Sequence, residues 1–456
     1  MGSASTHSSN SLARRDLTRI YAAAVSAVAP AHLIGLALGG ELADAKKVPA
    51  LLADASRIFL VAAGKAARGM AAELAARLGP KLQEALAIFP SSPQASGPAP
   101  AAAAAGEAHD SIWTIAAAHP VPDSSSERAG AAALEIARRA GPGDLFLLAL
   151  SGGASSLMVA PAGQVTLADK IAINAALLRS GASIRELNIV RRHLSAIKGG
   201  GLLRACGGAR VLSLVVSDVA QNDLATIGSG PTAADPTTFA EAIGVLKRRG
   251  LWGRAPESIR DRLERGAAGE VAETVKPGDP LLGRVDNVVI GDNRTALEAA
   301  ASAAAAAGYA VDRWRELYGE ADDVGRALSA HLSAIGGERV CVVAGGEPVV
   351  TVRGEGRGGR AQQAALAMAL ELQRLGRERR IMALFAGTDG VDGPTDAAGA
   401  FVSPRTAERA REAGLDPAAA LARNDAYSLF GALGDLLVTG PTGTNVSDIF
   451  IGLVNY

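Results

Sequence analysis

This chain of 456 residues has no excess charge, few cysteines and no long apolar run. Its 46 basic and 46 acidic residues balance, which argues against a dedicated nucleic-acid-binding protein, since such proteins carry a basic excess. Two cysteines, Cys206 and Cys341, cannot build a disulfide framework, so we expect a reducing, cytoplasmic setting. No uninterrupted apolar run reaches the ~18 residues of a membrane helix, and the polar start does not resemble a secretory signal.

Several catalytic signatures are also missing. No Gly-x4-Gly-Lys-Ser/Thr sequence occurs, so the sequence does not predict a P-loop nucleotide site. No Gly-x-Ser-x-Gly elbow supports a serine nucleophile, and no Cys/His spacing suits a zinc ion. Any activity therefore depends on other residue patterns.

Short apolar runs with polar ends are what the sequence does contain. Each run has the length of a buried strand and is followed by small, polar or ionisable residues, and helical stretches separate most of them. This alternation predicts an α/β fold whose sheets are mainly parallel and flanked by helices, with ligands at the carboxyl ends of the strands. The runs are residues 57–63, 145–150, 211–217, 287–290, 340–344, 381–386 and 436–438.

The length favours two domains, because single hydrophobic cores stop growing near about 250–300 residues. Residues 266–284 are rich in glycine, proline and charge, which is typical of a boundary. We therefore expect an N-terminal α/β domain over residues 1–285 and a C-terminal α/β domain over residues 286–456.

Three segments of the N-terminal half are candidates for binding an anion. Lys65 follows a predicted strand at the head of a helix, and is either a phosphate ligand or a solvated helix-start lysine. The loop Ser151-Gly152-Gly153, continued by Ser155, has more serines and glycines than a tight turn requires, so we favour anion binding. Lys198 precedes three glycines and belongs either to a cationic site or to a helix terminus.

Asp218 and Asp389 each follow an apolar strand. Strand-end aspartates commonly hold Mg²⁺ in α/β enzymes, since this hard cation prefers oxygen ligands. The alternative for each is a helix N-cap. The polar residues Asn445 and Asp448 lie between two apolar runs, where they either line a site or cap a turn.

A literal G-x-G-x-x-G occurs at Gly354, Gly356 and Gly359, with a predicted strand before it (349–352) and a predicted helix after it (362–375). That context suits a dinucleotide fingerprint. The same loop carries Arg353, Arg357 and Arg360, however, and three guanidiniums suit terminal phosphates better than a pyrophosphate held by backbone alone.

In order along the chain, these motifs resemble those of glycerate 2-kinases that carry a C-terminal MOFRL domain. The resemblance spans about 380 residues, nearly everything beyond the first helices, and the ordered set is specific at family level. The matching stretches are AAGKAA (62–67), HPVPD (119–123), SGGASSL (151–157), LSAIKGGGL (194–202), VSDV (216–219), GSGPT (228–232), GDN (291–293), GGE (345–347), GRGGR (356–360), GTDGVDGPTDAAGA (387–400) and TGPTGTN (439–445).

The resemblance implies ATP- and Mg²⁺-dependent phosphorylation of D-glycerate on its 2-hydroxyl, with the site in a cleft between two α/β domains. It implies catalytic roles for Lys65 and Arg360 and a metal at Asp218 or Asp389. Positioning and charge neutralisation are what phosphoryl transfer chiefly needs. The substrate- and phosphate-binding residues it implies are Ser151, Gly152, Gly153, Ser155, Lys198, Asn293, Glu347 and Asn445.

The sequence departs from the family pattern at Ala361-Gln362-Gln363 and at residues 220–223, AQND, which concerns how a metal or nucleotide is held nearby. Two alternatives stay open at this point. One is an NAD(P)H-dependent hydroxypyruvate reductase, which rests on the G-x-G-x-x-G motif. The other is a non-catalytic sugar-phosphate-binding module, since serine- and glycine-rich anion loops recur on α/β folds of many functions. In each case the partners are small molecules, not nucleic acid or membrane.

Overall fold

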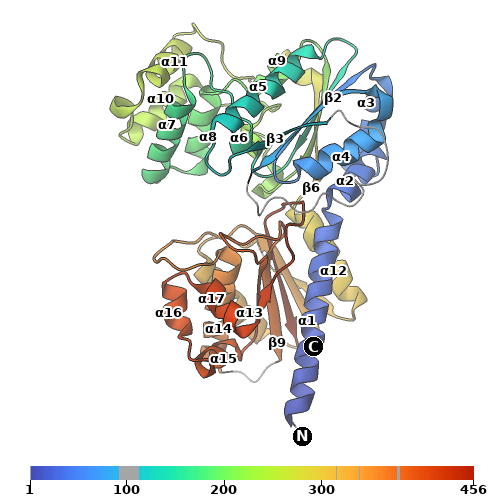
Figure 1. The fold of residues 1–456 in the computed structure, drawn as a ribbon, viewed down its shortest axis with the longest axis vertical. Helices are drawn as coiled ribbons and strands as arrows, with labels where there is room; N and C mark the ends of the chain where they lie inside the picture. Colours follow the sequence, from blue (N-terminus) through green and yellow to red (C-terminus); the bar gives the residue numbers. More distant parts are fainter. Residues whose placement is uncertain (1, 92–111, 315, 338, 377–379) are drawn as a thin grey trace. The chain divides into compact units, whose positions relative to one another are not determined.

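A computed structural model describes residues 2–91, 112–314, 316–337, 339–376 and 380–456 (Figure 1). The chain forms two compact units, Pro30–Ile290 and the remainder, which joins residues up to Ala29 with Gly291–Tyr456. The expected boundary after residue 285 lies at the first residue of strand β6 (Val285–Gly291). The first helix, expected in the N-terminal domain, belongs to the unit that contains the C-terminal half.

The unit Pro30–Ile290 is built on a six-stranded sheet in the order β3-β2-β1-β4-β5-β6, and its pairings from β3 to β5 are parallel. β1 and β4 are buried along their whole length, which explains their continuous apolar sequences, because both faces of a parallel sheet are covered. The predicted parallel sheet is confirmed here. Besides β6, its strands are β1 (Ile58–Ala63), β2 (Leu82–Pro90), β3 (Ile112–Ala117), β4 (Leu145–Leu150) and β5 (Arg210–Val216).

The helices of this unit form two groups. α4 and α5 pack against strands of the sheet, whereas α7, α8, α10 and α11 share a separate apolar core around Leu187 and Phe239 (Figure 1). Capping boxes begin α7, α8 and α10, as expected where Ser or Thr precedes an acidic residue by three positions. The α-helices are α2 (Pro30–Leu38), α3 (Val48–Asp54), α4 (Ala67–Leu78), α5 (Ser124–Arg139), α6 (Ala154–Leu157), α7 (Leu167–Arg179), α8 (Ile184–His193), α9 (Gly201–Ala205), α10 (Phe239–Arg248) and α11 (Glu257–Ala267).

The second unit contains a mixed sheet in the order β11-β10-β9-β12-β8-β7. β12 runs antiparallel to both β8 and β9, and β10 runs antiparallel to β9. The prediction of a mainly parallel sheet is wrong for this unit: among the strands described, only β7 and β8 pair in parallel. The strands are β7 (Ala310–Arg313), β8 (Val340–Gly346), β9 (Ile381–Gly387), β10 (Gly399–Val402), β11 (Leu436–Leu437) and β12 (Asp448–Val454).

Helices cover both faces of the mixed sheet. α14 is the most buried and packs against α13, β9 and β10, while α1 packs against α12, β9 and β12 (Figure 1). Tyr21 of α1 donates a hydrogen bond to the carbonyl of Gly387, 2.8 Å away, which ties the first helix to the end of β9. The α-helices are α1 (Gly2–Ala27), α12 (Asn293–Ala306), α13 (Ala321–Ala334), α14 (Arg360–Leu375), α15 (Thr406–Glu412), α16 (Pro417–Ala422) and α17 (Ala426–Leu433).

Candidate functional site

Lys65 lies at the carboxyl end of β1, where its loop touches the loop after β4. The Lys65 amide donates to the carbonyl of Gly152 (2.9 Å), and the Ala66 amide donates to Oγ of Ser151 (2.9 Å). Gly64 makes this contact possible: its φ is +130°, and an added Cβ would lie 2.2 Å from Oγ of Ser151. The two predicted anion-binding segments are therefore neighbours at one sheet edge.

Ser155 and Lys198 also meet at this edge. Nζ of Lys198 donates to Oγ of Ser155 (2.6 Å) and to its carbonyl (2.8 Å), and Oγ of Ser155 lies 3.2 Å from Oγ of Ser229. Gly153, with φ +90°, opens the short helix α6, and an added Cβ there would lie 3.2 Å from the ring of His119. The loop 151–155 therefore carries hydroxyl groups and lies beside the buried Lys198, and this combination suits an anion.

Two buried lysines lie close to this loop. Burial, followed by the charges of Lys170 and Arg191, holds the pKa of Lys198 well below its ordinary value. Burial likewise lowers the pKa of Lys170 to about 7, with Arg262 and Arg191 contributing; its Nζ donates to the carbonyl of Leu194 (2.9 Å). The cations of this region repel one another, which is typical of a site that receives negative charge.

Asp218 follows β5, next to β4 in the sheet, and is half-buried. Because β1, β4 and β5 are parallel, Lys65, the 151–155 loop and Asp218 lie along the same edge. The divergent residues 220–223 follow directly. Gln221 and Asn222 adopt left-handed backbone conformations (φ +59° and +55°), and Asp223 accepts the Ala225 amide (3.1 Å).

The corresponding edge of the mixed sheet is formed by the ends of β8 and β9 and the start of β12. Asp448, the first residue of β12, pairs with Gly346 of β8 on one side and Gly387 of β9 on the other. Asn293, at the start of α12, donates from Nδ2 to the carbonyls of Val446 (2.7 Å) and Asp448 (3.0 Å). Asn293 thus holds the start of β12 in place.

Arg360, the first residue of α14, forms a fork with Asp448: Nε lies 2.5 Å from Oδ2 and Nη2 lies 3.2 Å from Oδ1. Its Nη1 donates to Glu347 at the end of β8. Burial opposes the charge on Arg360, but the carboxylates of Asp448 and Glu347 outweigh it and raise its pKa. A guanidinium held by two carboxylates has a fixed direction and a permanent charge.

Asp392 stabilises the start of α14, the helix that Arg360 begins. Its carboxylate accepts the amides of Ala361 (3.1 Å) and Gln362 (2.8 Å), so it caps α14. Burial, and then the charge of Asp448, raise the pKa of Asp392 to about 7. Gly359 permits the approach, since an added Cβ would lie 2.1 Å from Oδ1 of Asp392.

Asp389 lies in the turn after β9, where its Oδ1 accepts the Val391 amide (3.1 Å). A Cβ at Gly387 would be 3.0 Å from Oδ1 of Asp389 and 3.5 Å from Oδ1 of Asp448. These two carboxylates are therefore near neighbours, and oxygen donors of this kind fit a Mg²⁺ ion that arrives with a nucleotide. In the described part of the chain, no group of three or more His, Cys, Asp or Glu residues could hold a metal by itself.

The loop before β12 is bound to the turn after β9. Thr388 donates from Oγ1 to the carbonyl of Ser447 (2.7 Å) and accepts the Val446 amide (2.9 Å). Asn445, a predicted binding residue, is buried in this loop, and its Oδ1 accepts the Ser447 amide at 3.4 Å. Asn445 therefore helps to shape the turn that precedes Asp448.

The dinucleotide reading of G-x-G-x-x-G is not supported. Residues 349–352 do not form the expected strand, although the helix expected over 362–375 is present as α14. Gly354 and Gly356 approach the 423–425 turn closely: an added Cβ at either would lie 2.6 Å from the Arg423 carbonyl. These glycines are thus explained by packing.

The three arginines of this loop also diverge. Arg353 reaches Asp322 (3.6 Å) and Arg357 lies over the ring of Tyr427 (4.6 Å), so Arg360 is the one that joins the carboxylates at the sheet edge. The divergent Gln362 and Gln363 donate to Thr395 (3.0 Å) and Asp322 (2.8 Å) within the helical layer.

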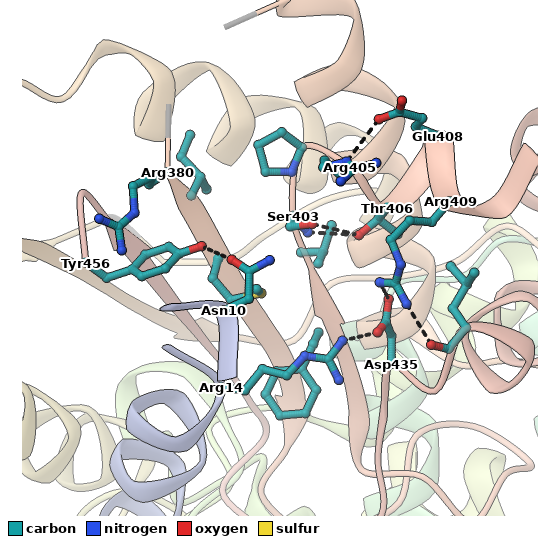
Figure 2. Close-up of a pocket in the computed structure, with 16 residues that line it drawn as sticks. Asn10, Arg14, Arg380, Ser403, Arg405, Thr406, Glu408, Arg409, Asp435 and Tyr456 are labelled. Atoms are coloured by element: carbon teal, nitrogen blue, oxygen red, sulfur yellow. Dashed lines mark hydrogen bonds and ion pairs between the residues drawn. The ribbon is translucent and has the colours of Figure 1, made fainter. Parts of the chain in front are cut away.

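A cavity of about 730 Å³ lies at the opposite end of the mixed sheet, lined by the first residues of β9 and the last residue of β10 (Figure 2). Arg14 and Arg409 both pair with the buried Asp435, and Arg405 pairs with Glu408 (3.2 Å). None of the predicted site residues lines this cavity.

Among the described helices, none alone is long and apolar enough to span a membrane. One bent pair, Asn10–Ala27 with Pro30–Leu38, meets the criteria of length and composition when the two helices are taken together.

Comparison with known proteins identifies the chain. Residues 16–264 match the model of a family described as a domain of unknown function, DUF4147, and residues 340–448 match the MOFRL family. A D-glycerate 2-kinase from Thermotoga maritima is 36% identical, over 87% of this chain and 91% of that protein. The chain belongs to the glycerate 2-kinase family with a C-terminal MOFRL domain.

Other glycerate kinases are also similar to this chain. A glycerate 2-kinase from Pyrococcus horikoshii is 40% identical over 75% of this chain and 78% of its own length. The crystal structure of a Thermotoga maritima glycerate kinase superposes with a TM-score of 0.81 at 34% identity, covering 98% of this chain and all of that one. A relative from Agrobacterium vitis, provisionally named a hydroxypyruvate reductase, is 44% identical over 74% of this chain and 76% of its own length.

The sequence predicts Asp448 either as a site residue or as a turn cap, and it gives no prediction for Asp392. For Asp448 the available signal was an acidic residue directly before a fully apolar run. Asp392 lies 32 residues from the helix that it caps, counted to Arg360, so local capping patterns do not reveal it.

Proposed function

We propose that this protein transfers the γ-phosphoryl group of ATP to the 2-hydroxyl of D-glycerate, giving 2-phosphoglycerate and ADP. The observation that carries the proposal is the match to a named D-glycerate 2-kinase over 87% of the chain. It is supported by the residues that lie at one edge of each sheet. Lys65 and the 151–155 loop are at one sheet edge, and Arg360 with its carboxylates is at the other.

In this mechanism the 2-hydroxyl oxygen forms a bond to the γ-phosphorus as the bond to the bridging oxygen of ADP breaks. Negative charge is spread over the equatorial oxygens of the phosphoryl group during transfer. We assign its stabilisation to Lys65 and Arg360. Arg360 is pre-oriented by Asp448 and Glu347, so little reorganisation is needed at the moment of reaction.

We assign the other predicted residues to binding. Backbone amides and hydroxyls of Ser151, Gly152, Gly153 and Ser155 suit phosphate oxygens or the substrate carboxylate. Lys198 places a donor beside Ser155. In the mixed-sheet unit, Glu347 orients Arg360, while Asn293 and Asn445 shape the start of β12.

Magnesium would be held by Asp389, with Asp448 beside it, or by Asp218 at the edge of the parallel sheet. When bound, the ion neutralises phosphate charge and orients the nucleotide. Asp448 is already shared with Arg360, so Asp389 is the carboxylate better placed to accept an ion.

The test is an assay of ADP release with D-glycerate, L-glycerate, tartronate semialdehyde and hydroxypyruvate as acceptors, with the phosphorylated product identified by ³¹P NMR. We expect ADP release that depends on D-glycerate, and a 2-phosphate product. ADP release that is the same with and without each acceptor would overturn the proposal and leave the non-catalytic binding module. A 3-phosphate product would contradict the assignment of the 2-hydroxyl.

A hydroxypyruvate reductase is the second candidate, because relatives from Agrobacterium vitis carry that provisional name. The glycines at 354, 356 and 359 argue against it, since packing against residues 423–425 and Asp392 explains them. Oxidation of NADH by hydroxypyruvate in the absence of ATP would favour the reductase.

A further inference from the structure

Beside the helical cluster of the parallel unit lies a cavity of about 200 Å³, and of its cationic residues the proposed reaction uses only Lys198. Its walls come from residues 161–163, the end of α8 and the segment after it, α9, the start of α10, α11 and the segment after α11. Four of the described residues that line it are cationic and none is acidic. The cations are Arg192, Lys198, Arg204 and Arg262, and Ser195 and Thr274 add hydroxyl groups.

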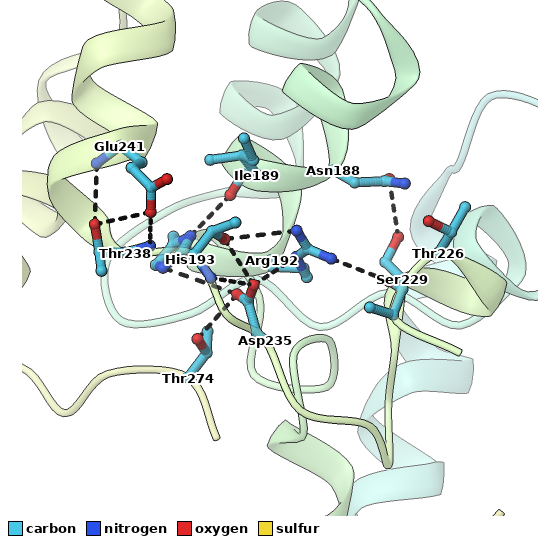
Figure 3. Close-up of polar contacts among 12 residues, drawn as sticks. Asn188, Ile189, Arg192, His193, Thr226, Ser229, Asp235, Thr238, Glu241 and Thr274 are labelled. Carbon is cyan, nitrogen blue, oxygen red and sulfur yellow. Dashed lines mark hydrogen bonds and ion pairs between the residues drawn. The ribbon is translucent and has the colours of Figure 1, made fainter. Parts of the chain in front are cut away.

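One of the four cations is already neutralised. Arg192 lies 3.2 Å from Asp235, which also accepts a hydrogen bond from Thr274 (2.9 Å) and lies 3.9 Å from His193 (Figure 3). The Arg192 guanidinium further donates to the carbonyl of Ala225 (3.1 Å). Asp235 therefore holds one wall of the cavity and balances one charge.

The other three cations are anchored by neutral oxygens. Arg262 donates from Nε to the carbonyl of His193 (2.7 Å), and Arg204 donates from Nη2 to the carbonyl of Glu273 (2.8 Å). Lys198 is held by Ser155, as described above. Carbonyl groups orient these side chains but do not neutralise their charge, so positive charge accumulates around a cavity that has room for a small ligand.

The pKa shifts of nearby groups are consistent with positive charge accumulating around this cavity. Burial, and then Arg265, lower the pKa of Arg262, and the charge of Arg262 contributes to the lowered pKa of Lys170. Bringing cations together under partial burial costs stability unless a counter-ion is present. Guanidinium forks match the tetrahedral oxygens of phosphate, and a phosphate dianion accepts several hydrogen bonds at once.

We propose that this cavity is a second anion site, which binds inorganic phosphate or the phosphate group of a small phosphorylated acid. The site shares Lys198 with the 151–155 loop, whereas Arg192, Arg204 and Arg262 come from the helical side of the cavity. The proposal goes beyond phosphoryl transfer and needs neither nucleotide nor glycerate.

Isothermal titration of the full chain with inorganic phosphate, at neutral pH and without substrates, tests the site. We expect one phosphate to bind the wild type and also Lys65→Ala, which disables the proposed catalytic edge. Arg262→Met and Arg204→Met should each weaken binding by about tenfold or more, because each removes a charge-assisted contact. Arg204 is exposed, so its variant should fold even if loss of the Arg262 anchor destabilises the cluster. Arg265→Met, on the same helix as Arg262 but outside the cavity, is the matched control.

A second titration replaces phosphate with 2-phosphoglycerate. Tighter binding that is still lost in Arg204→Met assigns the site to phosphorylated acids, and equal binding assigns it to free phosphate. The proposal is overturned if the wild type binds no phosphate below about 10 mM, a concentration at which even weak specific sites fill. It is also overturned if Lys65→Ala abolishes binding while Arg204→Met and Arg262→Met retain it, or if Arg265→Met weakens binding as much as they do.

Discussion

The two sheet edges carry different charged and polar groups. At the parallel edge, Lys65 and the hydroxyl and amide groups of the 151–155 loop lie on strand-to-helix loops. At the mixed edge, Arg360 is enclosed by Glu347 and Asp448, and Asp392 caps its helix. One edge offers a lysine beside neutral donors, whereas the other holds a guanidinium among acids. A lysine can follow a moving phosphate, while a forked arginine supplies charge in a fixed direction.

The largest effect that separates the two edges is expected from Lys65→Ala. Loss of the ammonium should lower kcat by about 10³-fold with little change in KM, since the charge is needed most during transfer. Steady-state measurement of ADP release checks this, with the exposed Lys46→Ala as the control. An unchanged kcat would remove Lys65 from the mechanism.

The close contact between the two loops of the parallel edge can be broken at Gly64. Gly64→Ala combines φ +130° with a Cβ that would lie 2.2 Å from Oγ of Ser151. We expect the free energy of unfolding to fall by about 3 kcal/mol or more. Gly79→Ala, with φ +57° and open space around its Cβ, should cost only about 1 kcal/mol. Thermal unfolding followed by circular dichroism measures both, and equal losses would show that the loop contact is unimportant.

Arg360→Lys tests the importance of the fork at the edge of the mixed sheet. The charge stays, but the fork to Asp448 is lost, so we expect kcat to fall by about 10- to 100-fold. Arg357→Lys is the matched control, because Arg357 stacks on Tyr427 away from the carboxylates. Full activity in Arg360→Lys would mean that orientation by Asp448 and Glu347 has no catalytic role.

The most gradual effect, spread over several pH units, is expected from the buried Lys170. The folded state lowers the pKa of Lys170 to about 7, so above this pH the unfolded chain binds a proton that the folded chain has released. Stability should therefore rise between about pH 7 and pH 10, by at most about 1.4 kcal/mol per pH unit from this group. Lys170→Met should flatten the rise of the unfolding temperature between about pH 7 and 9. A slope equal to that of the wild type would refute the contribution.

Sequence reasoning worked best where a strand, a loop and a helix follow each other along the chain. Lys65, Ser151 and Asp218 each follow a mainly apolar run, and parallel strands bring such ends to one edge. The helix after Gly359 was also recognised, although its first residue is Arg360 rather than residue 362.

It failed where the signal was ambiguous or absent. β2 contains alanine and leucine at spacings that also suit a helix, and it was not recognised. The run 349–352 has strand-like residues but makes only an isolated bridge, between Val349 and Glu320. The apolar run of β12 predicts a strand but the wrong direction, because a continuous apolar run is typical of a parallel strand buried on both faces.

The amino-acid sequence by itself determined the α/β class, the two-part organisation and the strand ends that carry polar groups, since these follow from local runs of apolar residues and the loops after them. Tertiary structure alone decided the antiparallel course of β12, the pairing of Arg360 with Asp448 and the cap that Asp392 provides for α14. These contacts join residues 30 to 88 positions apart. They depend on which strands pair and on which buried charged groups come into contact. No short segment of the sequence determines either of these.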